Sequence, residues 1–194
     1  MKTIFKTAFN LIIKPKSTWQ HIFKLKISKV DLFLNYGLTF ALIGPVLSFY
    51  SLYIEENYPI KKVLTYSLTT YVLDLLSVLI LASFLFFIFI LFKNYKNFDS
   101  AFKLSLFIYI PIWLSDIVDI YQPLRILSNV GLIYSLYLLY LGLKVIFDIK
   151  ISMKKDFIFF IFICGIHLIL YILDALFSEI IVTNPLLKEF LNQL

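Results

Sequence analysis

The chain has 194 residues, of which 61% are apolar and 15% are charged, whereas soluble domains are about half apolar and about a quarter charged. This composition excludes a soluble enzyme domain, a disordered chain and a disulfide-rich secreted module. The single cysteine, Cys164, excludes an intramolecular disulfide and a Cys-based zinc site. A net charge of +6 on so apolar a chain favours a membrane over nucleic acid as partner. We therefore expect an integral membrane protein.

Residues 1–30 form a basic amino-terminal segment. Its apolar run, from Ala8 to Ile13, is short and is followed by Lys14-Pro15-Lys16 instead of a small-residue cleavage site, so we do not expect a cleavable signal peptide. The helical spacing of its apolar residues predicts two basic amphipathic helices separated at Pro15, with Trp19 as an anchor in the inner membrane interface. This segment either serves topogenesis and anchoring alone or forms a platform for anionic lipids or a protein partner.

Five stretches are long and apolar enough to cross a bilayer, which requires about 20 residues each. Residues 31–194 are therefore predicted to form one membrane domain. The gaps between the stretches leave no room for a soluble catalytic domain. We predict an all-α integral membrane helical bundle with five transmembrane helices, preceded by the interfacial amphipathic helices. The predicted spans are residues 31–54, 63–92, 101–120, 124–147 and 157–182.

The basic residues are distributed unequally between the two sides of this membrane domain. Of 18 Lys and Arg, 14 fall before the first span or around the second and fourth gaps, and four fall on the opposite side. The positive-inside rule then places the N-terminus in the cytoplasm and the C-terminus outside. The 14 are Lys2, Lys6, Lys14, Lys16, Lys24, Lys26, Lys29, Lys93, Lys96, Lys103, Lys144, Lys150, Lys154 and Lys155.

Polar residues inside the spans recur at helical spacing. Each ionisable group in hydrocarbon costs several kcal/mol, so its presence needs a reason. The second and fifth spans each carry a polar face, and two further acids lie near the outer end of the third. Two interpretations stay open: cation or proton handling along an acidic seam, or hydrogen bonds that join the helices. The candidate seam consists of Asp74, Asp116, Asp119, His167, Tyr171 and Asp174.

Small residues form stripes on the first and fourth spans, where they let helix backbones approach closely. The candidate helix-packing residues are Gly37, Ala41, Gly44, Gly131, Ser135 and Gly142. Pro45 and Pro111 are candidate kinks, because proline removes a backbone donor from the helix.

Catalytic signatures are missing from the sequence. It contains no glycine-rich phosphate loop, no His-Glu-x-x-His, no Gly-x-Ser-x-Gly and no Cys-x-x-Cys. We expect no catalytic residues, no cofactor, no metal site and no enzymatic activity.

Several motifs are more specific than the composition. They read Ala101-Phe-Lys-Leu104, Tyr109-Ile-Pro111-Ile-Trp113-Leu114, Pro123-Leu124 and a Gly/Tyr-rich run from Gly131 to Leu143. With the Lys14-Pro15-Lys16-Ser-Thr-Trp19-Gln-His-Ile22 opening, the chain resembles the Yip (Ypt/Rab-interacting protein) family, in particular its short bacterial members. Lys144 departs from the proline often found after the Gly-Leu pair. The resemblance implies a five-span bundle with a cytoplasmic N-terminus and offers no catalytic residues.

The leading functional hypothesis is a non-enzymatic multipass protein that organises membrane or protein partners. The alternative is a transporter or lipid-handling protein that uses the acidic seam. We expect the lipid bilayer as partner, with anionic lipids at the inner surface and a protein partner or homo-oligomer as open options, and no nucleic acid. The abundance of Lys, Ile, Phe and Tyr is compatible with an AT-rich bacterial genome, so the expected location is the bacterial cytoplasmic membrane.

Overall fold

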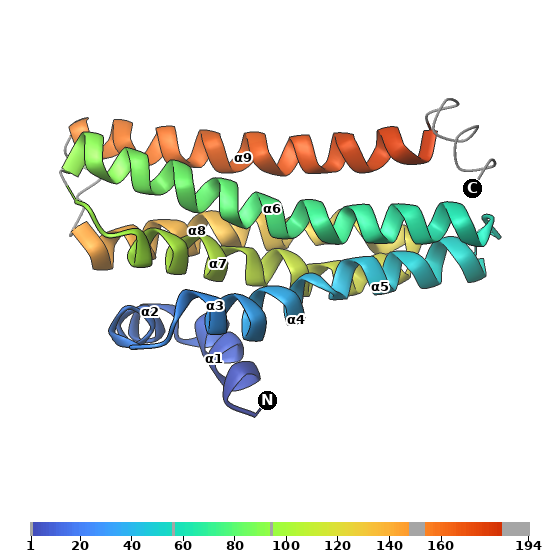
Figure 1. Cartoon of the computed structure of the whole chain (residues 1–194), viewed down its shortest axis with the longest axis horizontal. Helices are drawn as coiled ribbons and strands as arrows, with labels where there is room; N and C mark the ends of the chain where they lie inside the picture. The colour runs from blue at the N-terminus through green and yellow to red at the C-terminus, as the bar shows by residue number, and fades with distance from the viewer. Residues whose placement is uncertain (1, 56, 94, 148–153, 184–194) are drawn as a thin grey trace.

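The structure, a computed structural model, describes residues 2–55, 57–93, 95–147 and 154–183. Every element formed by these residues is helical. Five of its helical segments are long and apolar enough to span a membrane: Lys29–Ile54, Ile60–Lys93, Phe98–Val118, Ile126–Phe147 and Lys154–Leu173. The predicted fold class is thus confirmed. Figure 1 shows the spanning helices aligned along the long axis of the molecule.

The first spanning segment consists of several short helices. It runs through α3 (Lys29–Leu32), a π-helical turn (Phe33–Gly37), α4 (Leu38–Ala41), α5 (Ile43–Tyr50) and a second π-helical turn (Ser51–Glu55). The break between α4 and α5 falls at Leu42, one turn before Pro45. Proline cannot donate to the carbonyl four residues earlier, which accounts for a break at this position.

The second segment is α6 (Ile60–Lys93), with 34 residues. At a rise of about 1.5 Å per residue it is roughly 51 Å long, well beyond the hydrocarbon thickness of about 30 Å. The fifth is α9 (Lys154–Thr183), which lies beside α6 (Figure 1). A salt bridge of 2.6 Å joins Lys93 at the end of α6 to Asp156 at the start of α9. This ion pair fixes the relative register of the two longest helices.

The third segment, α7 (Phe98–Ser115), occupies the centre of the bundle. In its spanning window 72% of residues are buried, against 28% to 39% in the other four. Asn97 caps its N-terminus by accepting a hydrogen bond from the backbone N–H of Ser100, and the helix continues through Pro111. Because its neighbours shield it from lipid, α7 can carry polar side chains that an outer helix could not.

The connection from α7 to the fourth span is longer than predicted, because the third span ends at Val118 and the fourth begins at Ile126. Two 3₁₀ helices, Asp116–Ile120 and Gln122–Ser128, precede α8 (Asn129–Phe147). The predicted fourth span began at residue 124, inside the second of these turns. The hydroxyl oxygen of Ser115 at the end of α7 lies 2.7 Å from the carbonyl oxygen of Ile112 and 2.8 Å from that of Ser128, so it can share its hydrogen between α7 and the end of the connection.

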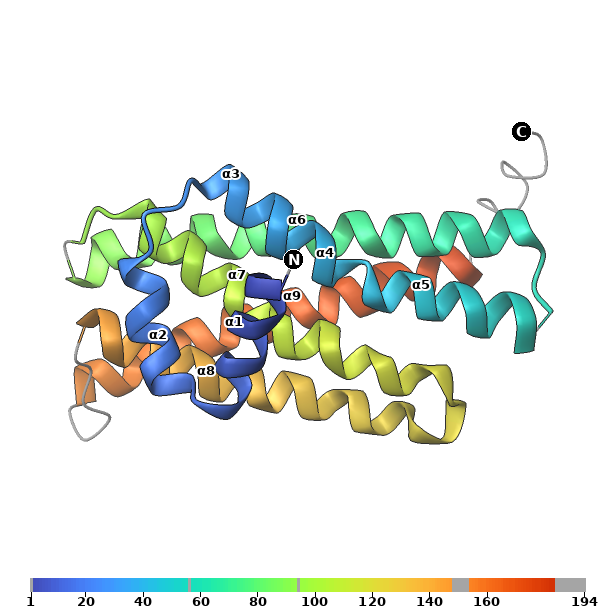
Figure 2. The same cartoon turned by 90° about the horizontal axis from the view of Figure 1, so that it is seen from below.

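The amino-terminal helices α1 (Lys2–Ile13) and α2 (Pro15–Lys24) lie across one flank of the bundle (Figures 1 and 2). We call this pair the amino-terminal hairpin. Pro15 occupies the first turn of α2, where its missing N–H costs nothing. The hydroxyl of Thr18 lies 3.0 Å from the carbonyl of Asn10 and 2.8 Å from that of Lys14. This hydroxyl ties the start of α2 to the end of α1.

Trp19 differs from the expected interfacial anchor, because its side chain is completely buried in the bundle. Its ring stacks on Phe23 and meets Phe107 of α7 edge-on, at centroid distances of 5.2 and 6.2 Å. The amphipathic pattern of residues 15–24 is the same for a helix that faces lipid and one that faces protein. Here the apolar face of α2 covers α7 and α8.

Candidate functional site

His167 is the centre of the predicted polar seam. It lies on α9 and its side chain is fully buried. The Nε2 atom lies 2.8 Å from the hydroxyl oxygen of Ser135 on α8, and that oxygen lies 2.7 Å from the carbonyl of Leu132. A serine hydroxyl has one hydrogen. When it donates to the Leu132 carbonyl, Ser135 accepts from Nε2–H; when it donates to Nε2, the ring hydrogen lies on Nδ1.

Two aromatic residues of α7 enclose this histidine. The ring of Tyr109 meets the imidazole edge-on at a centroid distance of 5.3 Å. The ring centroids of Tyr109 and Trp113 are 5.7 Å apart. Within the described residues, Nδ1 of His167 and Nε1 of Trp113 have no hydrogen-bond partner. Such groups cost free energy when buried without a partner. The centre of the bundle thus holds one satisfied contact, Ser135–His167, and two polar atoms not satisfied by described protein groups.

The Ser135–His167 contact also has the spacing of a nucleophile and its base, which the sequence did not indicate. Two features argue against that chemistry. Both side chains are fully buried, and the serine hydroxyl also contacts the Leu132 carbonyl. The stripe of small residues on the fourth span predicted Ser135 to be a packing residue. Its role as the partner of His167, 32 positions away, was not predictable from the spacing within one helix.

Asp74 lies on the inward face of α6 with 6% of its surface exposed. Ser67 and Ser77 are buried on the same helix, and the hydroxyl of Ser105 on α7 donates to the carbonyl of Val78 at 2.6 Å. Asp74 and Tyr171 each interact with other groups of the protein. Polar groups therefore join α6 to its neighbours at this level, as expected where lipid supplies no hydrophobic drive for helix association.

Asp116 packs against α5 rather than at His167. Its carboxylate Oδ2 lies 2.6 Å from the position that a Cβ atom would take on Gly44, so the glycine makes room for the carboxylate. The described structure thus separates the acidic seam into at least two environments. The side chains of Asp119 and Asp174 lie outside the described residues.

The other predicted packing residues lie mainly against α7. A side chain on Gly131 would collide with Ser115 and the Pro111 carbonyl, and one on Gly37 would approach Phe33 and Leu106. Ala41 is fully buried in the main core. Gly142 is the exception, because it also meets Trp19 of the hairpin. Small residues on the first span and on α8 therefore allow both helices to pack closely against α7.

Two polar side chains of the bundle hold the hairpin, and neither contact was predicted from the sequence. The hydroxyl of Tyr134 on α8 donates to the carbonyl of Ile12 at 2.6 Å. The ammonium of Lys103 on α7 donates to the carbonyl of Leu25 and pairs with Asp99, both at 2.7 Å. The Lys103 side chain is only 2% exposed, although the charge count treated it as a surface cation. Each of the two side chains satisfies a carbonyl near a helix end, where such groups lack partners within the helix.

The described residues contain no group of three or more His, Cys, Asp or Glu side chains with the spacing to hold a metal ion. The arrangement can hydrogen-bond helices together at the bundle centre, and it can present a basic segment on its flank.

These features define a multipass helical membrane protein with a docked amphipathic amino-terminal hairpin. A family model described as the Yip1 domain matches residues 9–173, from the second half of α1 to the second half of α9. The chain therefore belongs to the Yip1 domain family, as its motifs indicated. No curated protein and no solved structure matches it.

Proposed function

We propose that this Yip-family protein is a non-enzymatic organiser, in which a rigid five-span bundle displays the amino-terminal hairpin to membrane or protein partners at the cytoplasmic surface. The observation that carries the proposal is the docking of the hairpin. Its apolar residue Trp19 is buried in the bundle, and Tyr134 and Lys103 bind its backbone. A segment needed for anchoring alone would not require three specific contacts with the bundle.

The outward face of α2 supports a role in partner binding. The exposed residues on this face are Lys16, Gln20, His21 and Lys24. Residues 1–30 of the chain contain seven Lys and no acidic residue. The basic face fits a cytoplasmic orientation and the bacterial inner membrane. The closed Ser135–His167 contact supports a non-enzymatic role.

Site-specific photocrosslinking in cells tests this function. A photoreactive residue at His21 should give discrete adducts with protein or lipid, and Trp19→Ala should abolish them by releasing the hairpin. A photoreactive residue at Leu76, exposed on the lipid-facing side of α6, serves as the control for non-specific lipid contact. Adducts that are equal at His21 and Leu76, or that persist after release of the hairpin, would refute the organiser function.

One observation favours the alternative of transport. Nδ1 of His167 and Nε1 of Trp113 are buried without partners among the described residues, and Asp74 is buried on a facing helix. Histidine and aspartate side chains can pass protons when water reaches them, whereas the indole N–H of Trp113 only donates a hydrogen bond. Liposomes containing the purified protein, assayed for cation flux and lipid scrambling, should be silent under the organiser function. Flux that Asp74→Asn abolishes would establish the alternative instead.

A further inference from the structure

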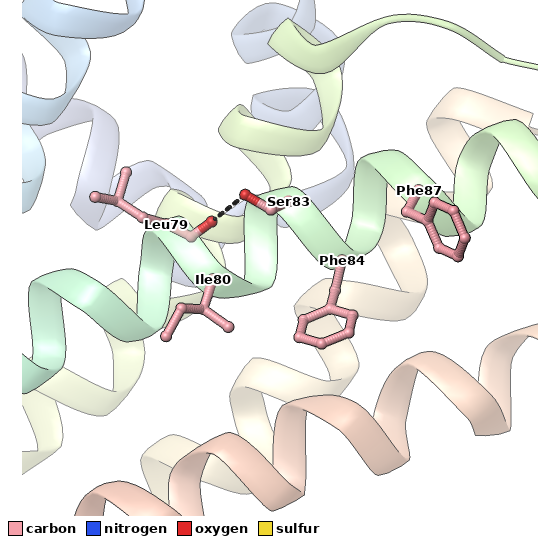
Figure 3. A pocket seen from close by; sticks show the side chains of 5 residues that line it. All are labelled: Leu79, Ile80, Ser83, Phe84 and Phe87. Carbon is pink, nitrogen blue, oxygen red and sulfur yellow. Dashed lines mark hydrogen bonds between the residues drawn. The ribbon is translucent and has the colours of Figure 1, made fainter.

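A surface cavity of about 550 Å³, open to its surroundings and lined by both polar and apolar groups, lies where the first turn of α2 meets α8. It differs from the lipid-facing grooves elsewhere on the bundle. Figure 3 shows one of these, along α6, where Phe84 and Phe87 form part of the lining and the Ser83 hydroxyl donates back to the Leu79 carbonyl at 2.9 Å. That groove presents hydrocarbon, whereas the α2–α8 cavity presents cations and hydrogen-bond donors. The lining residues are Lys14, Pro15, Lys16, Ser17, Gln20 and Tyr137.

The cations of this cavity have no carboxylate partner in the part of the chain that the structure describes. Lys14 and Lys16 are exposed, and neither forms an ion pair with a residue that the structure describes. Lys93 and Lys103, in contrast, each hold a carboxylate. The two free ammonium groups, the Gln20 amide and the Tyr137 hydroxyl together offer donors suited to an anionic oxygen cluster.

The position of the cavity relative to the membrane identifies the class of anion. The outward face of α2 is polar, while α1 exposes the apolar side chains of Phe5, Phe9 and Ile13. The cavity, at the junction of the two helices, therefore borders both a polar and an apolar surface. A soluble anion needs no hydrocarbon beside its site, but a phospholipid does.

An apolar track leads from the cavity along α8. Tyr137, Ile133 and Val130 are exposed, and their spacing of four and three residues places them on one helical face. At about 1.5 Å per residue the track is roughly 10 Å long. It runs away from the basic end of α8, towards the predicted outer side, as an acyl chain of an inner-leaflet lipid would.

We propose that this cavity binds the headgroup of an anionic phospholipid of the inner leaflet, with one acyl chain along Tyr137, Ile133 and Val130. The phosphate oxygens accept hydrogen bonds from Lys14 and Lys16, and the Tyr137 ring borders both headgroup and chain. The inference deepens the proposed function, because it requires the docked hairpin and names the lipid class that the hairpin recognises.

Native mass spectrometry of the purified full chain tests the site, with phosphatidylglycerol, phosphatidylcholine and inorganic phosphate as separate probes. The protein should retain phosphatidylglycerol in preference to phosphatidylcholine. A Lys14→Gln/Lys16→Gln double variant should bind phosphatidylglycerol on the order of 10-fold more weakly, as expected for two lysines beside an anionic headgroup. The matched control is Lys26→Gln/Lys29→Gln, which removes the same charge from exposed positions of the same segment outside the cavity and should bind normally.

Three outcomes would overturn the site: no preference for the anionic lipid, equal losses in the two double variants, or displacement of the lipid by equimolar inorganic phosphate. Ile133→Asn provides a second test, since it should weaken lipid binding while leaving the cationic cavity intact; unchanged lipid binding would contradict the proposed track. If the lipid preference is absent but the His21 crosslinks persist, this site fails and the organiser function stands. If the crosslinks do not depend on Trp19, the organiser function fails whatever the lipid result.

Discussion

The indole ring of Trp19 on α2 lies against Gly142 on α8, where a Cβ atom would stand 3.2 Å from Cε2 of the indole. The same added atom would collide with a methyl group of Leu104 on α7. Position 142 is thus the point where the hairpin, the central helix and the fourth span meet, and where the absence of a side chain makes all three contacts possible.

Gly142→Val should release the hairpin, because the new side chain occupies the space of the indole ring. Overpacking of this kind costs about 1–3 kcal/mol. Trypsin should then cleave the hairpin after its exposed lysines faster than in the unmodified protein. Gly165→Val is the matched control, since nothing lies within 4 Å of the Cβ position at Gly165. Equal cleavage of the two variants would contradict the docking.

Lys103→Met should destabilise the protein by about 1.5–3 kcal/mol, the range for hydrogen bonds to charged groups. The substitution leaves the Leu25 carbonyl and the Asp99 carboxylate without their shared partner. Thermal unfolding in detergent micelles measures the loss. Lys96→Met removes an exposed charge from the preceding connection and should be nearly neutral. A similar loss in both variants would assign the effect to net charge instead.

Ser135→Ala should cost about 1–3 kcal/mol, because it leaves the fully buried Nε2 of His167 without its partner. The comparison is Ser83→Ala on α6, whose exposed hydroxyl bonds only within its own helix. The difference in melting temperature between the two variants isolates the contact between helices. If Ser135→Ala is as stable as Ser83→Ala, the hydrogen bond contributes nothing.

The Lys93–Asp156 pair should behave as a clamp between α6 and α9. Its side chains are 25% and 12% exposed, so removing either partner should cost about 1–3 kcal/mol, between the values for exposed and buried pairs. Lys93→Asp and Asp156→Lys should each lower the melting temperature, and the double exchange should recover part of the loss. Additive losses in the double variant would exclude a direct pair.

Cysteine labelling should test the predicted orientation. In a Cys164→Ser background, a cysteine at Lys61 should react with an impermeant maleimide in intact cells. A cysteine at Lys6 should react only after the membrane is opened. Both lysines are exposed, so access differs only by side. The reverse pattern would invert the topology and place the anionic-lipid site in the other leaflet.

The sequence was sufficient for the spans because each depends on its own residues. A run of about 20 apolar side chains is a local property, so five such runs predict five spanning helices without knowledge of their neighbours. The same holds for the break near Pro45 and the division of the hairpin at Pro15. The order of these elements and the family motifs were likewise visible in the chain alone.

Contacts between distant residues were not predictable from the same patterns. Lys103 looked like a topogenic surface cation, yet its ammonium binds a carbonyl 78 residues away. Ser135 matched a small-residue stripe, yet its hydroxyl meets His167 on another helix. Periodicity identifies which face of a helix is polar or small, but the partner depends on how the helices assemble in three dimensions. The candidate seam is therefore not one continuous site, because Asp116 lies beside Gly44 and not at His167.

The docking of the hairpin also imposes an order on biosynthesis. The hydrogen bond from Tyr134 to Ile12 joins residues separated by 122 positions. Ile12 is synthesised long before the helix that completes its contacts. Until α7 and α8 have inserted, the site that buries Trp19 does not exist. The first two helices therefore stay undocked at the membrane surface during that time. The docked position of these two helices thus requires that the later spans have been inserted and assembled. An exposed Trp19 therefore marks molecules whose assembly is incomplete.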